Sequence, residues 1–216
     1  MKATELLIKQ HRLVEDLFEK FEDAEETEEK REIFEQLAAN LVAHDAIERE
    51  IFYPACEKEL GEEDDVLGES LVEHGVVEFS LYRADANRTT DDFDKYVTVL
   101  KENVEHHVKE EEKELLPKVK SSMETSQLEE LGAKMEKRFQ EALKEDFREP
   151  LQENLEQVLA GRAKTQKKPA SKATRASARP PARSSSNARG KNHRGESRAA
   201  KRRRSSAPST TRARKR

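Results

Sequence analysis

Four segments of this chain place apolar residues at alternating steps of three and four, and each segment has one histidine in the same series. This spacing puts the residues of a series on one face of an α-helix. Each helix is therefore expected to direct a histidine, together with its apolar neighbours, toward a shared core. The four series are Leu7, His11, Val14, Phe18 and Phe21; Ile33, Leu37, Leu41, His44, Glu48, Ile51 and Ala55; Leu67, Leu71, His74, Glu78 and Leu81; and Phe93, Val97, Leu100, Val104, His107, Glu111 and Leu115.

The helical pattern extends over the first 160 residues and predicts an all-α fold. Short links between the first four helices favour an antiparallel, up-down-up-down four-helix bundle over residues 1–121, and residues 122–160 add an extra C-terminal helical extension. Thr89 with Asp92, and Ser126 with Glu129, have the spacing of capping boxes at two helix starts. Helices are expected at about 3–24, 28–60, 65–86, 90–121, 126–147 and 150–159.

Charge divides the chain at about residue 161. The last 56 residues have 20 Lys and Arg and a single acid, whereas 21 basic and 44 acidic residues stand in the first 160. The net charge of −4 therefore combines an acidic block of −23 with a basic block of +19. Residues 161–216 also have no Leu, Ile, Val, Phe, Tyr or Met, so this Lys/Arg-rich tail cannot bury apolar surface and is predicted to be disordered.

Three of the four series have a glutamate one turn after the histidine, namely Glu48, Glu78 and Glu111. Residues four apart are neighbours on a helix, so each histidine and its glutamate can reach a common point. A carboxylate in a bundle core is unfavourable without a positive partner, and no Lys or Arg stands in any series. Metal ions would supply this charge, as they do in dinuclear carboxylate sites of helical bundles.

A single histidine of this kind is more often an ordinary core residue, and a single glutamate on an acidic helix is more often solvated. Four histidines in phase on four helices favour a metal site instead, because the positions reinforce one another.

The fourth helix offers two overlapping registers, since His106 with Glu110 has the same spacing as His107 with Glu111. His107 is preferred because it continues the apolar series. In addition, "HVKEEEKELLP" at 107–117 repeats the His, Glu and Pro spacing of "HDAIEREIFYP" at 44–54. His106 is then expected to flank the site, and Glu112 stays open as a substitute ligand.

With these residues in view, the chain resembles the hemerythrin-like HHE cation-binding domains over about residues 1–121. The matching stretches are "KQHRLVEDLF", "HDAIEREIFYP", "EHGVVEFSL" and "VEHHVKEEEKELLP", in family order. The resemblance implies a four-helix bundle with two non-haem iron ions as cofactor. It further implies that His11, His44, His74 and His107 are terminal ligands and that Glu48 and Glu111 bridge the metals.

Glu78 stands where animal oxygen-carrying hemerythrins have another histidine, so the resemblance argues against simple reversible oxygen carriage. Glu78 is nevertheless expected to be a ligand, and Asp45 is a weaker candidate. Mixed imidazole and carboxylate donors suit iron, manganese or zinc, and the resemblance makes iron the expected metal. Cys56 has no histidine in phase to activate it and is expected to be inert.

These features leave more than one function open. The leading interpretation is a di-iron protein that senses or sequesters iron, oxygen, peroxide or nitric oxide, with a tail that binds nucleic acid. The alternatives are a di-iron enzyme that decomposes peroxide, and a structural nucleoid-associated protein. One cysteine and no apolar run of about 20 residues predict a cytoplasmic location, in part at the nucleoid, and no membrane partner.

The composition of residues 161–216 resembles that of linker-histone tails. Electrostatics allows the tail to bind nucleic acid, to bind an anionic membrane surface, or to fold back on the acidic bundle. A membrane is the least favoured partner because no apolar or lipidation anchor accompanies the charge.

Overall fold

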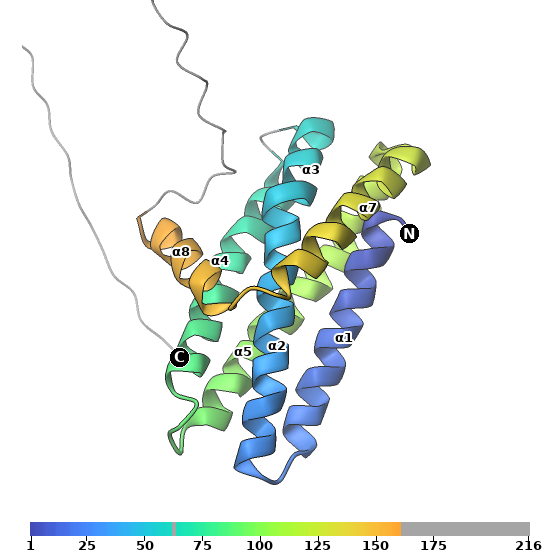
Figure 1. Ribbon diagram of the computed structural model, residues 1–216. Helices are drawn as coiled ribbons and strands as arrows, with labels where there is room; N and C mark the ends of the chain where they lie inside the picture. Colours follow the sequence, from blue (N-terminus) through green and yellow to red (C-terminus); the bar gives the residue numbers. More distant parts are fainter. Residues whose placement is uncertain (62–63, 161–216) are drawn as a thin grey trace, which may run out of the picture. The chain divides into compact units, whose positions relative to one another are not determined.

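The computed structural model describes residues 1–61 and 64–160, and the predicted tail at 161–216 lies outside the described residues. The described part is all-helical, as predicted, and its long helices form an antiparallel bundle (Figure 1). The bundle helices are α1 (Ala3–Asp23), α2 (Thr27–Ile47), α4 (Asp65–Ala86) and α5 (Phe93–Glu110), and the shorter ones are α3 (Tyr53–Leu60), α6 (Leu116–Ser122), α7 (Thr125–Ala142) and α8 (Arg148–Leu159).

Two of the predicted helices each contain one π-helical turn that the sequence analysis did not foresee. The turn η1 (Glu48–Phe52) joins α2 to α3, and η2 (Glu111–Leu115) joins α5 to α6. Each turn lies just before the helical turn that contains a proline, Pro54 or Pro117. Proline has no N–H and its ring clashes with the carbonyl four residues earlier, so a widened turn relieves the conflict. The repeated His, Glu and Pro spacing therefore encodes two π-turns, each beginning at a predicted ligand.

Both predicted capping boxes are wrong. Asp92 precedes α5, which begins only at Phe93, and the Asp92 side chain makes no capping hydrogen bond. The capping box of α7 is formed by Glu124 and Gln127, two residues earlier than predicted. Acidic and hydroxyl residues are so frequent in these links that spacing alone did not identify the cap.

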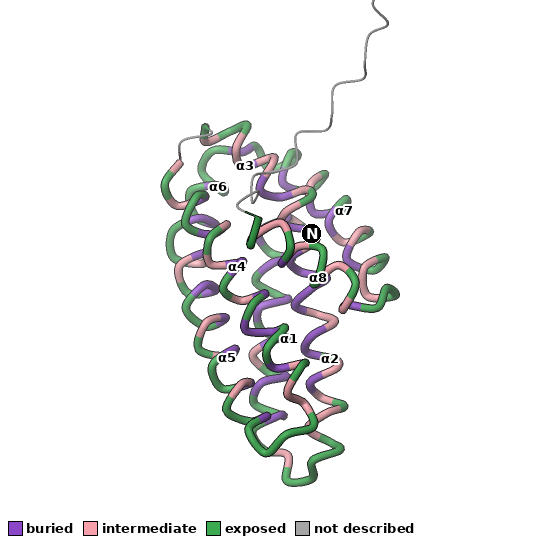
Figure 2. The backbone as a smooth tube through the Cα atoms, turned by 90° about the vertical axis from the view of Figure 1, so that its left-hand side faces the viewer, coloured by how far each residue is buried: buried purple, intermediate pink, exposed green. Residues whose placement is uncertain are grey.

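Buried residues recur along all the bundle helices (Figure 2), and they form two apolar clusters with a polar layer of buried histidines and glutamates between them. One cluster contains Phe18, Phe34 and Leu100, and the other contains Leu7 and Phe52. The histidine of each helix lies in the sequence between members of the two clusters. Apolar packing on both sides therefore fixes the helices while the middle of the bundle remains polar.

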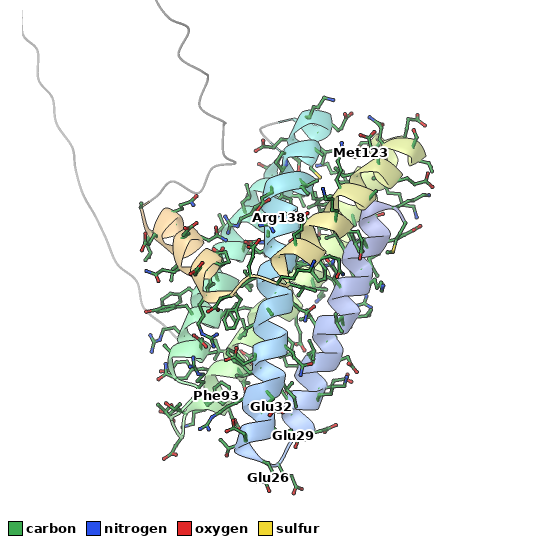
Figure 3. All side chains as sticks on the ribbon, viewed as in Figure 1. Glu26, Glu29, Glu32, Phe93, Met123 and Arg138 are labelled. Carbon is green, nitrogen blue, oxygen red and sulfur yellow. The ribbon has the colours of Figure 1, made fainter. Side chains whose placement is uncertain are left out.

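The C-terminal extension packs on the bundle through two helices. Helix α7 contacts α1 and α2, and α8 contacts α4. Arg138 of α7 (Figure 3) pairs with Glu50 of η1 through two hydrogen bonds of 2.8 and 2.9 Å. Within the described part of the chain, no helix combines the length and the apolar composition that a membrane crossing needs.

The contact between α7 and the N-terminus requires a glycine at position 132. A Cβ atom on Gly132 would lie 2.3 Å from the carbonyl oxygen of Met1 and 2.9 Å from the backbone nitrogen of Ala3. Backbone atoms cannot move aside as a flexible side chain can, so only glycine lets these two segments approach this closely.

We expect Gly132→Ala to lower the free energy of unfolding by about 1–3 kcal/mol, because the added methyl group displaces the N-terminal backbone from α7. The matched control is Gly68→Ala, also in a helix, where a Cβ has no neighbour within 4 Å. This control should gain about 0.5–1 kcal/mol from helix propensity. Urea denaturation measures both, and equal effects at the two positions would contradict the packing argument.

Candidate metal centre

One histidine from each bundle helix lies in the polar layer: His11 on α1, His44 on α2, His74 on α4 and His107 on α5. Their exposed fractions are 2–7%, and those of the two glutamates at the π-turns, Glu48 and Glu111, are 0 and 1%. The steps of three and four that place a residue on the apolar face of its helix bring these six side chains into one layer.

All four histidines are held by a hydrogen bond at Nδ1. The pairs are His11 with Glu112 (2.8 Å), His44 with Gln10 (2.9 Å), His74 with Asp45 (2.5 Å) and His107 with Glu73 (2.9 Å). An Nδ1–H that donates outward leaves the Nε2 lone pair on the opposite side of the ring. Acceptors behind imidazole ligands fix ring orientation and raise basicity in metal sites.

The Nε2 atoms and the two glutamates fall into two overlapping groups. His11, His44, Glu48 and Glu111 form one group, and Glu48, His74 and His107 form the other. Within each group the ligand atoms lie within 4.8 Å of one another. Because Glu48 belongs to both groups, the arrangement suits two metal ions that share a carboxylate.

Six atoms of this layer that could bind a metal ion have no hydrogen-bond partner among the described residues. They are Nε2 of His11 and His44 and both carboxylate oxygens of Glu48 and Glu111. A buried polar atom without a partner is unfavourable, and a buried carboxylate is more so. Cations at these positions would satisfy all of these atoms, so the residues fit a metal centre.

Proton equilibria at the layer also indicate a site that stabilises positive charge. Burial lowers the pKa of His11, but the carboxylate of Glu111, 3.2 Å from Nε2, and the hydrogen bond to Glu112 outweigh this effect and raise the pKa to about 9. Burial likewise lowers the pKa of His74, but the hydrogen bond to Asp45 and the carboxylate of Glu48, 3.1 Å from Nε2, raise it to about 10. Protons thus compensate the buried carboxylates, and a metal ion would have to displace them.

Glu78, the remaining predicted ligand, lies beside the two groups rather than within them. Its Oε2 forms an ion pair with Nη2 of Arg49 at 2.9 Å, and Nε of Arg49 donates a hydrogen bond of 2.7 Å to Asp45. Burial, and then the charge of Asp45, raise the pKa of Glu78 to about 7. Arg49 is not a member of the apolar series of its helix, yet its long side chain reaches Glu78. No Lys or Arg in the four series could have been predicted to pair with this carboxylate.

The structure also places the other candidates named from the sequence. Asp45 and Glu112 each bind the Nδ1 side of a histidine, as described above, and neither belongs to a ligand group. His106 is on the surface, with 63% of its side chain exposed, and lies 3.3 Å from Glu73. With Glu110 these two residues form a third, partly exposed group of donor atoms.

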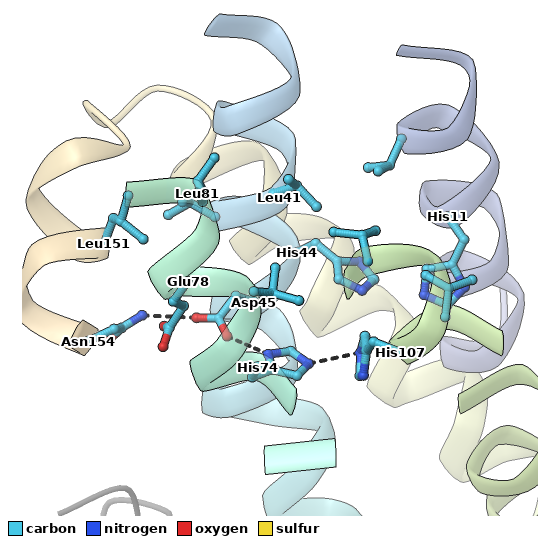
Figure 4. A pocket seen from close by; sticks show the side chains of 15 residues that line it. His11, Leu41, His44, Asp45, His74, Glu78, Leu81, His107, Leu151 and Asn154 are labelled. Carbon is cyan, nitrogen blue, oxygen red and sulfur yellow. Dashed lines mark hydrogen bonds and ion pairs between the residues drawn. The ribbon is translucent and has the colours of Figure 1, made fainter. Parts of the chain in front are cut away.

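Sequence reasoning missed several residues that shape the site. Tyr53, which lies outside the predicted ligand set, has its hydroxyl 2.7 Å from Nε2 of His74. Gln10 and Glu73 hold two of the histidines, and Asn154 of α8 donates to Oδ2 of Asp45 at 2.9 Å (Figure 4). The one signal for Gln10 was its place immediately before His11.

Cys56, the single cysteine of the chain, is buried. Burial raises the pKa of its thiol, so the thiol stays protonated at neutral pH. This agrees with the expectation of an inert residue, because the thiolate is the reactive form.

Comparison with known proteins now identifies the family. The hemerythrin HHE cation binding domain matches residues 2–119, more than half of the chain. The chain belongs to the hemerythrin HHE family. Membership implies that it binds metal cations, in agreement with the buried His and Glu groups. The resemblance seen in the sequence is thereby confirmed for the bundle.

This hemerythrin HHE domain is also similar to a solved structure, that of a hemerythrin HHE cation binding domain-containing protein from Mycobacterium kansasii. The identity is 22% and the TM-score 0.58, with 75% of this chain and 94% of that chain covered. At this identity the similarity supports the fold. A search of the curated proteins gave no match.

We expect His107→Ala to lose bound metal, since it removes one of three donors of the second group. The matched control His106→Ala changes the neighbouring, exposed histidine and should retain the metal. Metal per chain after gel filtration, measured by plasma mass spectrometry, tests the pair. Equal losses, or a greater loss in His106→Ala, would show that the register of α5 was misassigned.

Proposed function

We propose that this domain binds a dinuclear non-haem iron centre. Support comes from the two donor groups that share Glu48 and from their mixture of imidazole and carboxylate, which suits iron, manganese or zinc. Glu48, which belongs to both groups, is the proposed bridge, and Glu111, predicted from the resemblance to bridge as well, is proposed here as a ligand of the metal at His11 and His44. The other proposed ligands are His11, His44, His74 and His107.

Within this proposal the domain senses or sequesters iron, oxygen, peroxide or nitric oxide. Iron at such a site supplies redox chemistry and affinity for small molecules of this kind. The four histidines line a cavity of about 40 Å³ together with valine and leucine side chains (Figure 4). Since a water molecule needs about 10–15 Å³ of such space, the cavity has room for a ligand as small as oxygen, nitric oxide or peroxide.

Decomposition of peroxide is a second candidate, favoured by Tyr53. Its hydroxyl lies in the site, and burial, followed by the charges of Glu48 and Glu111, raises the pKa well above 10. The phenol therefore stays protonated at neutral pH and can donate a proton to a ligand beside His74. Steady-state peroxide consumption by the iron-loaded protein distinguishes this activity from sensing or storage, which would give no sustained turnover.

The iron-loaded protein should contain about two iron atoms per chain and melt at a higher temperature than the metal-free protein. The stabilisation follows from linkage, because the donors converge only in the folded state. Metal analysis, calorimetry and the visible charge-transfer bands of ferric iron, which zinc lacks, provide the measurements. Unchanged melting and no iron uptake would refute the proposal.

We further propose that residues 161–216 bind nucleic acid, on the basis of their balance of +19. The segment has no aromatic residue of the Phe, Tyr or Trp type for stacking on bases. Phosphate contacts and arginine in the minor groove would therefore provide the affinity, with little dependence on sequence. A role at the nucleoid, in which the metal only stabilises the bundle, is the corresponding structural alternative.

Truncation after Leu159 should abolish binding to duplex DNA and leave the iron content unchanged. For the full chain, the logarithm of affinity should fall with the logarithm of salt concentration by roughly 0.9 per phosphate contact. Gel-shift titrations at two or more salt concentrations measure both effects. If the truncated protein still shifts DNA, or the full chain shows no salt-dependent binding, the tail does not have this role.

A further inference from the structure

Arg49 is the cation that compensates two carboxylates at one side of the metal centre. Its side chain, 19% exposed, lies 2.7 Å from Asp45 and 2.9 Å from Glu78. Asp45 in turn binds Nδ1 of His74. The guanidinium group of Arg49 therefore contacts two carboxylates. Asp45 orients the proposed ligand His74, and Glu78 belongs to neither ligand group.

Glu78 stands at the sequence position expected of a ligand, but its carboxylate lies in neither ligand group. It follows His74 by one turn of α4, so its carboxylate is within reach of a metal bound at His74 Nε2. Among the described residues, however, the ligand group around His74 contains only Glu48 and His107. The pair with Arg49 accounts for this difference, because it directs Glu78 away from the group.

The group around His74 is consequently the less complete of the two. It has two histidines and one carboxylate as described, against two histidines and two carboxylates around His11. Sites with two histidines and one carboxylate leave coordination positions open in non-haem iron proteins. The cavity lies against His74 and His107 and is also lined by Asp45 and Glu78, so an open position there faces a space that either a small ligand or the Glu78 carboxylate can occupy.

Helix α8, which lies beyond the matched family domain, supports the same arrangement. Asn154 donates a hydrogen bond to Asp45 and also contacts Glu78, whose pKa burial and the charge of Asp45 raise to about 7 in spite of this contact. The helix approaches closely because Gly75 of α4 has no side chain, and a Cβ there would lie 3.1 Å from Val158. Arg49 and Asn154 thus act on the same two carboxylates from different elements.

We propose that Arg49, supported by Asn154, holds Glu78 off the metal of His74 and His107 and so keeps one coordination position open to a small ligand. This inference rests on the proposed iron centre. Without Arg49, Glu78 would be a buried carboxylate lacking a cation, and the metal would be the nearest positive charge. Glu78 would then bind the metal and compete with any ligand from solution.

The test is nitric oxide binding to the reduced, iron-loaded protein under anaerobic conditions, followed by visible absorbance. Nitric oxide is uncharged, so the loss of the Arg49 charge does not by itself repel it. Arg49→Gln should weaken binding by about tenfold or more, because an intramolecular carboxylate competes at an effective concentration of about millimolar or above. The double variant Arg49→Gln/Glu78→Gln should restore affinity to within about twofold of the wild type, since the competing carboxylate is gone.

The controls separate the explanations. Glu78→Gln alone should keep two iron atoms per chain, and a loss of iron in this variant would overturn the proposal even if Arg49→Gln failed to fold. If Arg49 acted only by orienting Asp45 and His74, the double variant would bind as weakly as Arg49→Gln, and the proposal would fail. Iron-loaded variants that all bind alike also refute it. A wild-type protein without iron would overturn the proposed function as well.

Discussion

The fold depends on how two buried carboxylates, Glu48 and Glu111, are compensated. Neither has a hydrogen-bond partner among the described residues, and both lie between two apolar clusters. Removing one such charge from water carries an effective penalty of about several kcal/mol. The four histidines, as protonated groups or as ligands beside a metal, are what offsets this penalty. The helices must therefore place all six side chains in one layer, and the π-turns at both glutamates are part of that placement.

The fold and the burial of these six side chains in one layer could be predicted because both follow from local spacing. A residue's face on a helix is fixed by its position in the series, so His44 and Glu48 share a face in any bundle that buries Leu41. Short links then set neighbouring helices antiparallel. The preference for His107 over His106 came from the same rule, and the structure buries the former and exposes the latter.

The surroundings of the donors could not be predicted, because contacts between helices determine them. Glu73 and Glu112 are two of many acids on outer helix faces, and only the packing between helices selects them as partners of His107 and His11. Arg49 illustrates a second reason. The position of a residue in a series gives only the helix face on which its Cα lies. The long side chain of an arginine can place its guanidinium group over a neighbouring face. The series around Glu78 therefore contained no cation, although one stood next to Glu48.

Two sets of carboxylates surround the proposed iron centre, and their negative charge affects which oxidation state of iron is stabilised. Glu48 and Glu111 lie among the donors, and Glu112, Asp45 and Glu73 lie behind three of the histidines. Both sets stabilise ferric more than ferrous iron, since the interaction grows with the charge of the ion. The positive charge of Arg49 offsets this stabilisation of ferric iron only in part, because Arg49 pairs with both Asp45 and Glu78. Reversible oxygen binding requires a ferrous resting state, so at the proposed iron centre this environment would favour reactions that begin from ferric iron, such as the proposed reaction with peroxide.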